Sequence, residues 1–320
     1  MKYLIWLSLL INVRGNEWHD FQKFIRTHNK FYETHEDFVK RFEIFSDNLK
    51  LIKFHNQLNK DLKLEANKFS DMLPHELFYG LKKNNMLSKT KKCDMFTKYN
   101  TKKLPSSVDW RSSAVTPVKD QGHCGSCWSF SATGAMEGAW AIKNKELVSL
   151  SEQQLMDCSF TYGDLACKGG LMDSAFKYAI DNGLCAEEEV PYEAERQTCE
   201  ISDCEAVVQF SGCMDVPSNN QLSLKAAVAQ QPVSVAIQAD KAVFQLYSSG
   251  VITGEECGTD LDHGVLIVGY GTENGKDYWL VKNSWGESWG DDGYVKIGRN
   301  DTIDNAGVCG IASSPSFPVV

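Results

Sequence analysis

The chain has 320 residues, 42% of them hydrophobic, and a formal net charge of −9 at pH 7, which is ordinary for a globular protein and excludes a low-complexity chain. Residues 16–103 hold 18 Lys and Arg against 12 Asp and Glu, whereas residues 104–320 hold 13 against 30. A basic segment of charge +6 therefore precedes an acidic domain of charge −17, which disfavours nucleic acid as a partner. The imbalance is compatible with two independently solvated surfaces, or with attraction between the segment and the domain.

The first 15 residues, MKYLIWLSLLINVRG, predict a secretory signal peptide. Lys2 supplies a positive start, Tyr3 to Val13 form a short apolar run, and Gly15 is a small residue suited to cleavage. The alternative is a buried N-terminal strand or helix. The run is too short to cross a bilayer of about 30 Å, and no later stretch reaches about 18 apolar residues, so we expect no membrane span.

Residues 18–80 are predicted to be helical. Asp37 and Arg41 lie four residues apart and can pair on a helix surface. Residues 82–103 are polar, Lys-rich and without periodicity, which predicts an exposed linker of the kind where proteolysis concentrates. An apolar stripe at helical spacing consists of Phe38, Phe42, Phe45, Leu49 and Ile52.

From Leu104 onward the sequence predicts helices first and strands later. The expected helices cover residues 128–143, 151–158 and 171–182. This order favours an α+β domain with two lobes, and ligand sites often form where lobes meet. The expected strands are short β-rich runs at residues 207–210, 232–239, 263–271, 278–285 and 293–298.

The strongest local motif is QGHCGSCWSF, residues 121–130. A thiol nucleophile needs a lowered pKa, because the thiolate attacks, and a helix N-terminus supplies partial positive charge. The Gly-rich run before Cys127 leads into a predicted helix, so Cys127 is expected where the helix begins. Its own backbone N–H would then point toward a developing oxyanion. A CxxC pair such as Cys124 and Cys127 could alternatively be a redox or metal motif.

This motif resembles the C-G-[SA]-C-[WY] signature of the papain and cathepsin family of cysteine peptidases. His263, in the Asp-His-Gly run at 262–264, stands 136 residues after Cys127. Asn283, in KNSWGESWG, stands 156 residues after it. The resemblance implies that His263 is the general base and that Asn283 orients its imidazole. It also implies that Trp285 shields their hydrogen bond and that Gln121 donates to the oxyanion. A catalytically inactive homologue would lack one of these residues.

The resemblance sorts the eleven cysteines, an odd number that leaves at least one thiol unpaired within the chain. We leave Cys213 free and expect Cys93, in the linker, to be lost on processing. Cys127 is the intended free thiol of the domain. The implied disulfides are Cys124–Cys167, Cys158–Cys199 and Cys257–Cys309. Of the cysteines that the resemblance does not assign, we pair Cys185 with Cys204.

Substrate recognition can be carried over by position. Gly169 and Gly170 match the glycines whose backbone pairs with an extended peptide. The pocket for the side chain two residues before the cut is expected to be apolar, with Ser314 as its polar member, which predicts Leu, Phe or Val at that substrate position (P2). Taken alone, Ala236 could equally be a core residue. The full expected substrate-binding set is Gly125, Gly169, Gly170, Leu171, Met172, Ala236, Leu261, Asp262, Gly264, Trp285 and Ser314.

The segment before Leu104 resembles the inhibitory propeptide of the cathepsin L-like branch. A second family motif is Gly-x-Asn-x-Phe-x-Asp, here with Glu65 in the glycine position. A plain amphipathic core helix would explain the apolar stripe but not the two motifs together. The first motif, with Asp in place of the usual Glu, is Asp37, Arg41, Phe45, Asn48, Ile52 and Asn56; the second continues with Asn67, Phe69 and Asp71.

The sequence therefore predicts a papain-like, α+β, two-lobed domain. One lobe is helical, with its central helix starting at the catalytic cysteine, and the other is β-barrel-like. A mainly helical propeptide precedes it. The expected division is 1–15 signal peptide, 16–103 propeptide and 104–320 peptidase. No His-His occluding loop is found, which favours an endopeptidase over a carboxydipeptidase. Activation is expected at acid pH.

We expect no cofactor and no metal. The expected partners are protein and peptide substrates, the chain's own propeptide and cystatin-type inhibitors, and the protein is expected to be a monomer. A secretory-pathway location is expected, in a lysosome or vacuole or outside the cell. Asn300 begins a potential glycosylation sequence, Asn-Asp-Thr.

Overall fold

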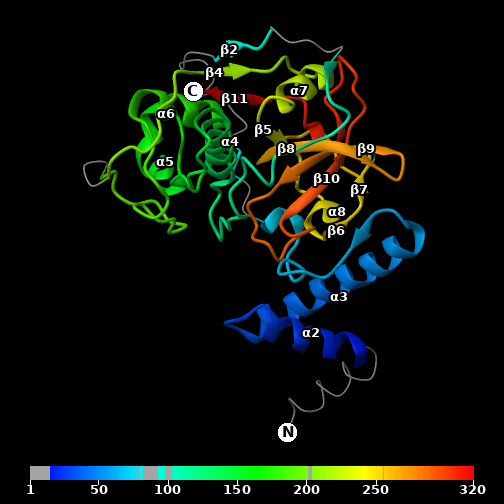
Figure 1. Ribbon diagram of the computed structural model, residues 1–320. Coiled ribbons are helices and arrows are strands. Elements are labelled where there is room, and N and C mark those ends of the chain that lie inside the picture. Colours follow the sequence, from blue (N-terminus) through cyan, green and yellow to red (C-terminus); the bar gives the residue numbers. More distant parts are fainter. Residues whose placement is uncertain (1–14, 78–79, 82–92, 98–102, 201–203, 255) are drawn as a thin grey trace.

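The computed structural model describes residues 15–77, 80–81, 93–97, 103–200, 204–254 and 256–320. The predicted signal peptide, apart from Gly15, and most of the predicted linker lie outside these residues. Figure 1 shows two lobes side by side, one mainly helical and one built on a sheet, with two N-terminal helices packed below the second. No helix in the described part of the chain is both long and apolar enough to cross a membrane.

The helical lobe is built around α4, Cys127–Asn144, which is buried along most of its length. Small residues let this helix approach the sheet closely: a Cβ on Gly134 would lie 2.7 Å from a Leu266 methyl group, and one on Gly138 would lie 2.6 Å from Pro232. The lobe also contains α5 (Glu152–Cys158), η3 (Ser159–Tyr162) and α6 (Met172–Asn182). The three predicted helices therefore form within one or two residues of their expected bounds.

The second lobe contains a nine-stranded sheet in the order β2-β4-β11-β5-β8-β9-β10-β7, with β3 paired to β8. Along the described residues this order is an open path, so the barrel-like lobe that we expected is not a closed barrel. Most of β8 is buried, and it pairs antiparallel with both β5 and β9. The strands are β2 (Asp94–Met95), β3 (Val108–Asp109), β4 (Gly212–Asp215), β5 (Val233–Ile237), β7 (Val251–Ile252), β8 (His263–Glu273), β9 (Lys276–Lys282), β10 (Tyr294–Gly298) and β11 (Ser316–Val319).

Helices also occur within the second lobe, which the order of helices first and strands later did not predict. They are α7 (Gln221–Val228), α8 (Ala242–Gln245) and η5 (Val308–Gly310). The run at 207–210 was wrongly expected to be a strand: only Val208 pairs, in an isolated bridge with Leu184. The N–H groups of Val207 and Val208 both donate to the Leu184 carbonyl oxygen, which is a contact with one residue and not a strand ladder.

The N-terminal segment, which we define as residues 15–77 with 80–81, has its own small core of four phenylalanines on two helices, α2 (Gly15–Thr27) and α3 (His35–Leu58). The Asp37–Arg41 pair predicted on α3 is present. The helical prediction is wrong beyond Leu58, because the chain there turns to pair with the main domain, residues 103–320. It forms β1 (Lys63–Leu64), which pairs with β6 (Tyr247–Ser249), and then η1 (Pro74–Glu76). The core residues are Phe21, Phe24, Phe42 and Phe45.

Ten of the eleven cysteines form disulfides, and among the described residues Cys127 alone is free. The expectation that Cys213 is free is wrong, because it bonds to Cys93. Parallel pairing of β2 with β4 brings these two cysteines together across 120 residues of sequence, a distance that local spacing cannot anticipate. The other four disulfides join the pairs that we expected: Cys124–Cys167, Cys158–Cys199, Cys185–Cys204 and Cys257–Cys309.

Candidate active site

Cys127 is the first residue of α4 and is fully buried. Its Sγ accepts hydrogen bonds from the backbone N–H of Gly264 at 3.2 Å and of Gly80 at 3.3 Å. Gly264 belongs to β8 of the sheet lobe, and Gly80 belongs to the N-terminal segment. The thiol therefore lies where the helical lobe, the sheet lobe and the N-terminal segment meet.

His263 is the first residue of β8, immediately before the glycine that contacts Sγ. Its Nε2 lies 2.8 Å from Oδ1 of Asn283. That oxygen also accepts from the Ser284 backbone N–H at 2.8 Å, so the amide presents an acceptor and Nε2–H is the donor. The Trp285 ring lies 4.9 Å from the imidazole between ring centroids, and it packs beside the His263–Asn283 pair.

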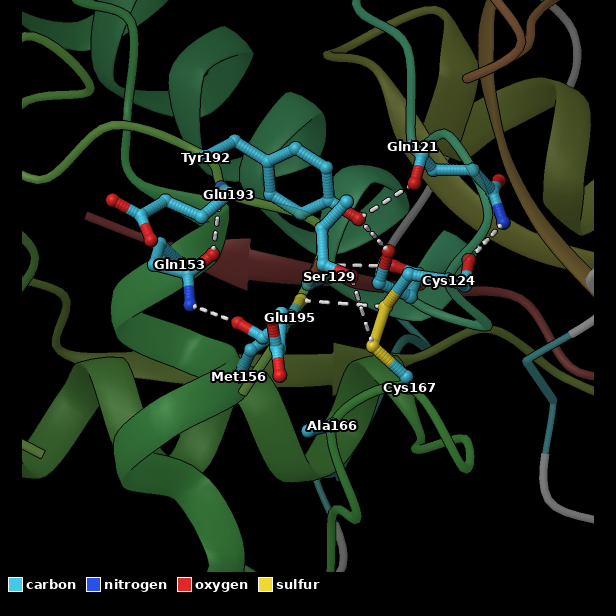
Figure 2. The surroundings of a disulfide bond; sticks show 12 residues. Gln121, Cys124, Ser129, Gln153, Met156, Ala166, Cys167, Tyr192, Glu193 and Glu195 are labelled. Atoms are coloured by element: carbon cyan, nitrogen blue, oxygen red, sulfur yellow. Dashed lines mark hydrogen bonds between the residues drawn. A yellow bond between two sulfur atoms is a disulfide. The ribbon is translucent and has the colours of Figure 1, made fainter. Parts of the chain in front are cut away.

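Gln121 is buried, and hydrogen bonds fix both its backbone and its side-chain amide. Its backbone N–H donates to the Ser284 carbonyl oxygen at 2.8 Å, and its Oε1 accepts from the Ser284 hydroxyl at 2.7 Å. Its Nε2 donates to the Cys124 carbonyl oxygen at 2.8 Å (Figure 2). The Tyr192 hydroxyl donates to the Gln121 carbonyl oxygen at 2.8 Å, and the Cys124–Cys167 disulfide lies beside this group. These contacts fix an amide donor in the loop that leads to α4.

Burial under the N-terminal segment keeps the thiol and the imidazole neutral. Desolvation raises the pKa of Cys127 to about 11, although the N–H groups of Gly264 and Gly80 oppose the shift. Desolvation also lowers the pKa of His263 to about 4, against the opposing hydrogen bond from Asn283. A thiolate–imidazolium pair is therefore disfavoured in the covered site.

The N-terminal segment crosses the site as an extended strand at Gly80 and Leu81. The Gly170 N–H donates to the Gly80 carbonyl oxygen at 2.9 Å, and the Leu81 N–H donates to the Asp262 carbonyl oxygen at 3.1 Å. A Cβ on residue 80 would lie 1.9 Å from the carbonyl oxygen of Gly125, so only glycine fits there. The segment contacts Sγ at this point through the Gly80 backbone N–H.

Two residues of the second N-terminal motif hold the segment against the sheet lobe. Asn67 is buried, and its Nδ2 donates to the Gln245 carbonyl oxygen at 2.8 Å. Phe69 packs edge-on against Trp285, with ring centroids 5.1 Å apart. Glu65, where the family has glycine, still donates its N–H to the Leu246 carbonyl oxygen at 2.9 Å. The segment therefore contacts the same indole that packs beside His263.

The remaining motif residues hold the N-terminal segment together. Asp71 accepts from Lys30 Nζ and from the Tyr32 hydroxyl, both at 2.8 Å. Arg41 Nη1 donates to the Asp71 carbonyl oxygen at 3.1 Å and to Glu76 Oε2 at 2.7 Å. Sequence reasoning missed Glu76, which belongs to neither family motif and is recognisable only by its contact with Arg41.

Two asparagines of α3 cap the loops that follow it. Asn48 Nδ2 donates to the Ser70 carbonyl oxygen at 2.9 Å. Asn56 exchanges two hydrogen bonds with the backbone of Leu64, at 2.8 and 3.0 Å. These side chains satisfy backbone groups of Leu64 and Ser70, beyond the end of α3, which explains why the chain can leave the helix there.

The expected substrate-binding residues form a partly connected set. Ala236 pairs with Gly264 across β5 and β8. A Cβ on Gly264 would lie 3.3 Å from the Met172 sulfur, which brings α6 to the same spot. Ser314 is exposed. Its neighbour Ser313 and Leu261 both lie close to Gly310. Gly169, with φ +104°, has a conformation suited to glycine, and it stands next to the Gly170 that pairs with the N-terminal segment.

A buried ionic cluster, also missed by sequence reasoning, lies behind the site and joins the lobes. Lys119 Nζ is 2.8 Å from Glu152 Oε1. Thr116 donates to Glu137 of α4 at 2.6 Å, and Lys282, next to Asn283, donates to the Thr116 carbonyl oxygen at 2.8 Å. The cluster therefore fixes the chain just before Asn283 relative to α4.

Residues 104–319 match the model of the papain family cysteine protease, and residues 21–77 match that of the cathepsin propeptide inhibitor domain (I29). The chain belongs to the papain family of cysteine proteases. The first match lies within the main domain, which we call the peptidase domain from here on, and the second lies within the N-terminal segment, which is the described part of what we call the propeptide.

Curated relatives and solved structures agree. The chain is 46% identical over 310 residues to "Probable cysteine protease RD21C" of Arabidopsis thaliana, covering 93% of this chain and 67% of that protein. It is 45% identical to "Thiol protease SEN102" of Hemerocallis sp., covering 94% of this chain and 86% of that protein. The structure of digestive procathepsin L 3 from Tenebrio molitor larval midgut superposes with a TM-score of 0.86 at 42% identity, covering 95% and 99% of the two chains.

Papain-family membership accounts for the arrangement of the two parts. The propeptide crosses the site of its own peptidase domain, as the match to an inhibitor domain implies. The disulfides and the propeptide fit a protein of the secretory pathway. Residues 78–103, which connect the two parts, lie outside both family matches.

Proposed function

We propose that the chain is the precursor of a cysteine endopeptidase, divided into a signal peptide (1–15), a propeptide (16–103) and a peptidase domain (104–320). The observation that carries the proposal is the position of Cys127 at the start of α4 beside Gly264, with His263 hydrogen-bonded to Asn283. This set supplies a nucleophile, a base and an orienting group, the combination that nucleophilic catalysis needs.

In the proposed mechanism the Cys127 thiolate attacks the peptide carbonyl carbon to form an acyl-enzyme. The N–H of Cys127 and Nε2 of Gln121 hold the oxyanion. In this mechanism Nε2 of His263 keeps its hydrogen bond to Asn283 while Nδ1 exchanges the proton with the thiol. The imidazolium then protonates the leaving amine, and the neutral imidazole activates water for deacylation.

Substrate preference is proposed from the pocket residues. Met172, Ala236 and Gly264 come together from α6, β5 and β8, and their surfaces are apolar. A branched or aromatic side chain at P2 would bury apolar surface there, so we propose Leu, Phe or Val at that position. Profiling a peptide library with acid-activated enzyme tests this, and a preference for Arg or Lys at P2 would contradict it.

The rival redox function needs a dithiol that can cycle between Cys124 and Cys127. Cys124 is instead bonded to Cys167, with a Cα–Cα distance of 4.7 Å, which argues against that cycle. A catalytically inactive homologue would lack one of the four catalytic candidates, and all are present. Thiol–disulfide exchange without sensitivity to an epoxysuccinyl inhibitor would favour the redox alternative.

The deciding experiment uses Cys127→Ala in the full precursor. Wild-type precursor incubated at pH 4.5 should gain activity on a fluorogenic peptide and lose it to an epoxysuccinyl inhibitor, whereas the variant should stay inactive with an unchanged unfolding temperature. Peptidase activity retained by the variant would overturn the assignment.

We also propose a compartment, an oligomeric state and a class of inhibitor for this protein. We propose an acidic lysosome or vacuole, or the extracellular space, a monomer in solution, and inhibition by cystatin-type proteins that occupy the same cleft as the propeptide. Cell fractionation, light scattering and inhibition assays with a cystatin test these three statements separately.

A further inference from the structure

One disulfide joins a residue outside both family matches to the peptidase domain. Cys93 lies between the inhibitor match, which ends at residue 77, and the protease match, which begins at residue 104. It bonds to Cys213 of β4, and both cysteines are buried. A cut near Lys103 therefore breaks the backbone but not the covalent connection between the two parts.

The residues after Cys93 are built into the sheet. Asp94 and Met95 form β2, which pairs with Met214 and Asp215 of β4 as an edge strand. The Phe96 N–H donates to the Asp215 carbonyl oxygen at 2.8 Å. These contacts continue the sheet that contains β11 and β5, so the segment is part of the folded peptidase domain.

Phe96 adds a side-chain anchor. It is 7% exposed, belongs to the core of the sheet lobe and packs edge-on against Phe317 of β11, with ring centroids 5.3 Å apart. Removing this segment would uncover Phe317 and the edge of β4 to water. The disulfide, the strand pairing and the aromatic contact are three separate reasons for the segment to stay in place.

We propose that Cys93–Thr97 is a permanent edge strand of the peptidase domain, and that the Cys93–Cys213 disulfide keeps the propeptide covalently attached after a single cut near Lys103. Release of the inhibitory part then requires either a cut on the N-terminal side of Cys93 or reduction of the disulfide. The inference rests on the proposed boundary between the propeptide (16–103) and the peptidase domain (104–320), but not on peptidase activity.

Tethering has a quantitative consequence for inhibition. A propeptide held by a short connection has an effective concentration of about millimolar at the cleft, far above the nanomolar concentration of a dilute enzyme. A singly cut precursor would therefore stay inhibited on dilution, whereas an untethered propeptide would dissociate. Because of the disulfide, activity depends on where the chain is cut. A cut near Lys103 leaves the propeptide attached, whereas a cut on the N-terminal side of Cys93 releases it.

The test uses full-length precursor carrying Cys127→Ala, with the recognition sequence of a site-specific viral protease inserted between residues 98 and 103. After cleavage, intact mass is measured in denaturant without reductant. One species containing both chains is expected. Dithiothreitol should then transfer two electrons and two protons to the disulfide, giving two thiols and two separate chains. Two chains already separate before reduction would overturn the proposal.

The matched control is the same protein with Cys93→Ser and Cys213→Ser together, which should separate in denaturant without reductant. Thiol titration keeps the test valid if this variant folds poorly. Denatured Cys127→Ala precursor should contain no reactive thiol, and two reactive thiols that map to Cys93 and Cys213 would contradict the proposal.

A second arm examines enzyme activated from wild-type precursor. Its peptidase chain should retain Cys93, either in the same chain or as a disulfide-linked peptide that dithiothreitol removes. A processed enzyme with a free Cys213 thiol and no residue 93 would contradict the proposal that Cys93–Thr97 is a permanent strand. Failure to activate at all would count against the proposed function instead, because the Cys127→Ala arm needs no activity.

Discussion

The backbone N–H of Gly80 donates to Sγ of Cys127 at 3.3 Å, so the main chain of the propeptide contacts the candidate nucleophile. The same residue has no room for a side chain, because a Cβ would lie 1.9 Å from the Gly125 carbonyl oxygen. Close backbone approach explains both the contact and the requirement for glycine.

Gly80→Ala should therefore weaken inhibition in the precursor. Overpacking of a tight contact costs about 1–3 kcal/mol, which corresponds to roughly 5- to 150-fold weaker closure of the cleft. Autoprocessing and leakage activity on a small fluorogenic peptide should rise accordingly. Gly254→Ala is the matched control, since a Cβ there would meet nothing within 4 Å. Equal effects of the two substitutions would contradict the steric argument.

The thiol should react differently before and after propeptide removal. In the precursor, burial raises the pKa of Cys127 to about 11, so the thiolate fraction rises about tenfold per pH unit below that value. Alkylation by iodoacetamide should keep rising through pH 9 in the precursor and should reach a plateau at lower pH in the processed enzyme. Cys127→Ala should take up no label. An equally low plateau in the precursor would show that the ion pair already exists there.

Gln121→Ala should lower kcat by about 10²–10³ with little change in KM, because it removes a donor that acts on the transition state. Steady-state kinetics on a fluorogenic peptide measure this. Gln197→Ala, at an exposed position, is the control and should behave as wild type. An unchanged kcat in Gln121→Ala, with a folded protein, would remove this residue from the oxyanion site.

Glu76 should contribute to the pH dependence of activation. Burial opposes ionisation, but hydrogen bonds from the Leu73 N–H, Arg41 and Lys40 outweigh it and lower the pKa of the Glu76 carboxyl. A lowered folded-state pKa means that stabilisation is present above the ordinary value of 4.5 and is lost as the pH falls through the lower folded value. Acid therefore loosens this part of the propeptide.

Glu76→Gln should mimic that loss at higher pH. Removing a charged partner of Arg41 costs about 1.5 kcal/mol, so precursor activation at pH 6 should be faster by about tenfold, and the difference should shrink below pH 4.5. Glu43→Gln, at an exposed position of α3, the helix that carries Arg41, is the control. A rate difference that persists unchanged at pH 3.5 would assign the effect to packing instead of charge.

Local patterns were enough to predict much of this protein. The start of α4 at Cys127 follows from a Gly-rich run before a helical stretch, and the stripe through Phe42 and Phe45 does become the core of the propeptide helices. Beyond Leu58 the helical prediction fails, because β1 gains more from pairing with β6 than from extending α3. Strand pairing of that kind depends on a partner some 180 residues away.

The sequence by itself determined the family, the helices of the helical lobe and the order of the candidate catalytic residues, since these depend on short motifs and on periodicity. Only the tertiary structure decided that Cys213 pairs with Cys93, that Glu76 forms an ion pair with Arg41, and that the Gly80 N–H donates to Cys127. Each of these is a contact between residues far apart in the chain. Such contacts are set by how the sheet edge, the propeptide helices and the cleft pack together, and no local pattern records that packing.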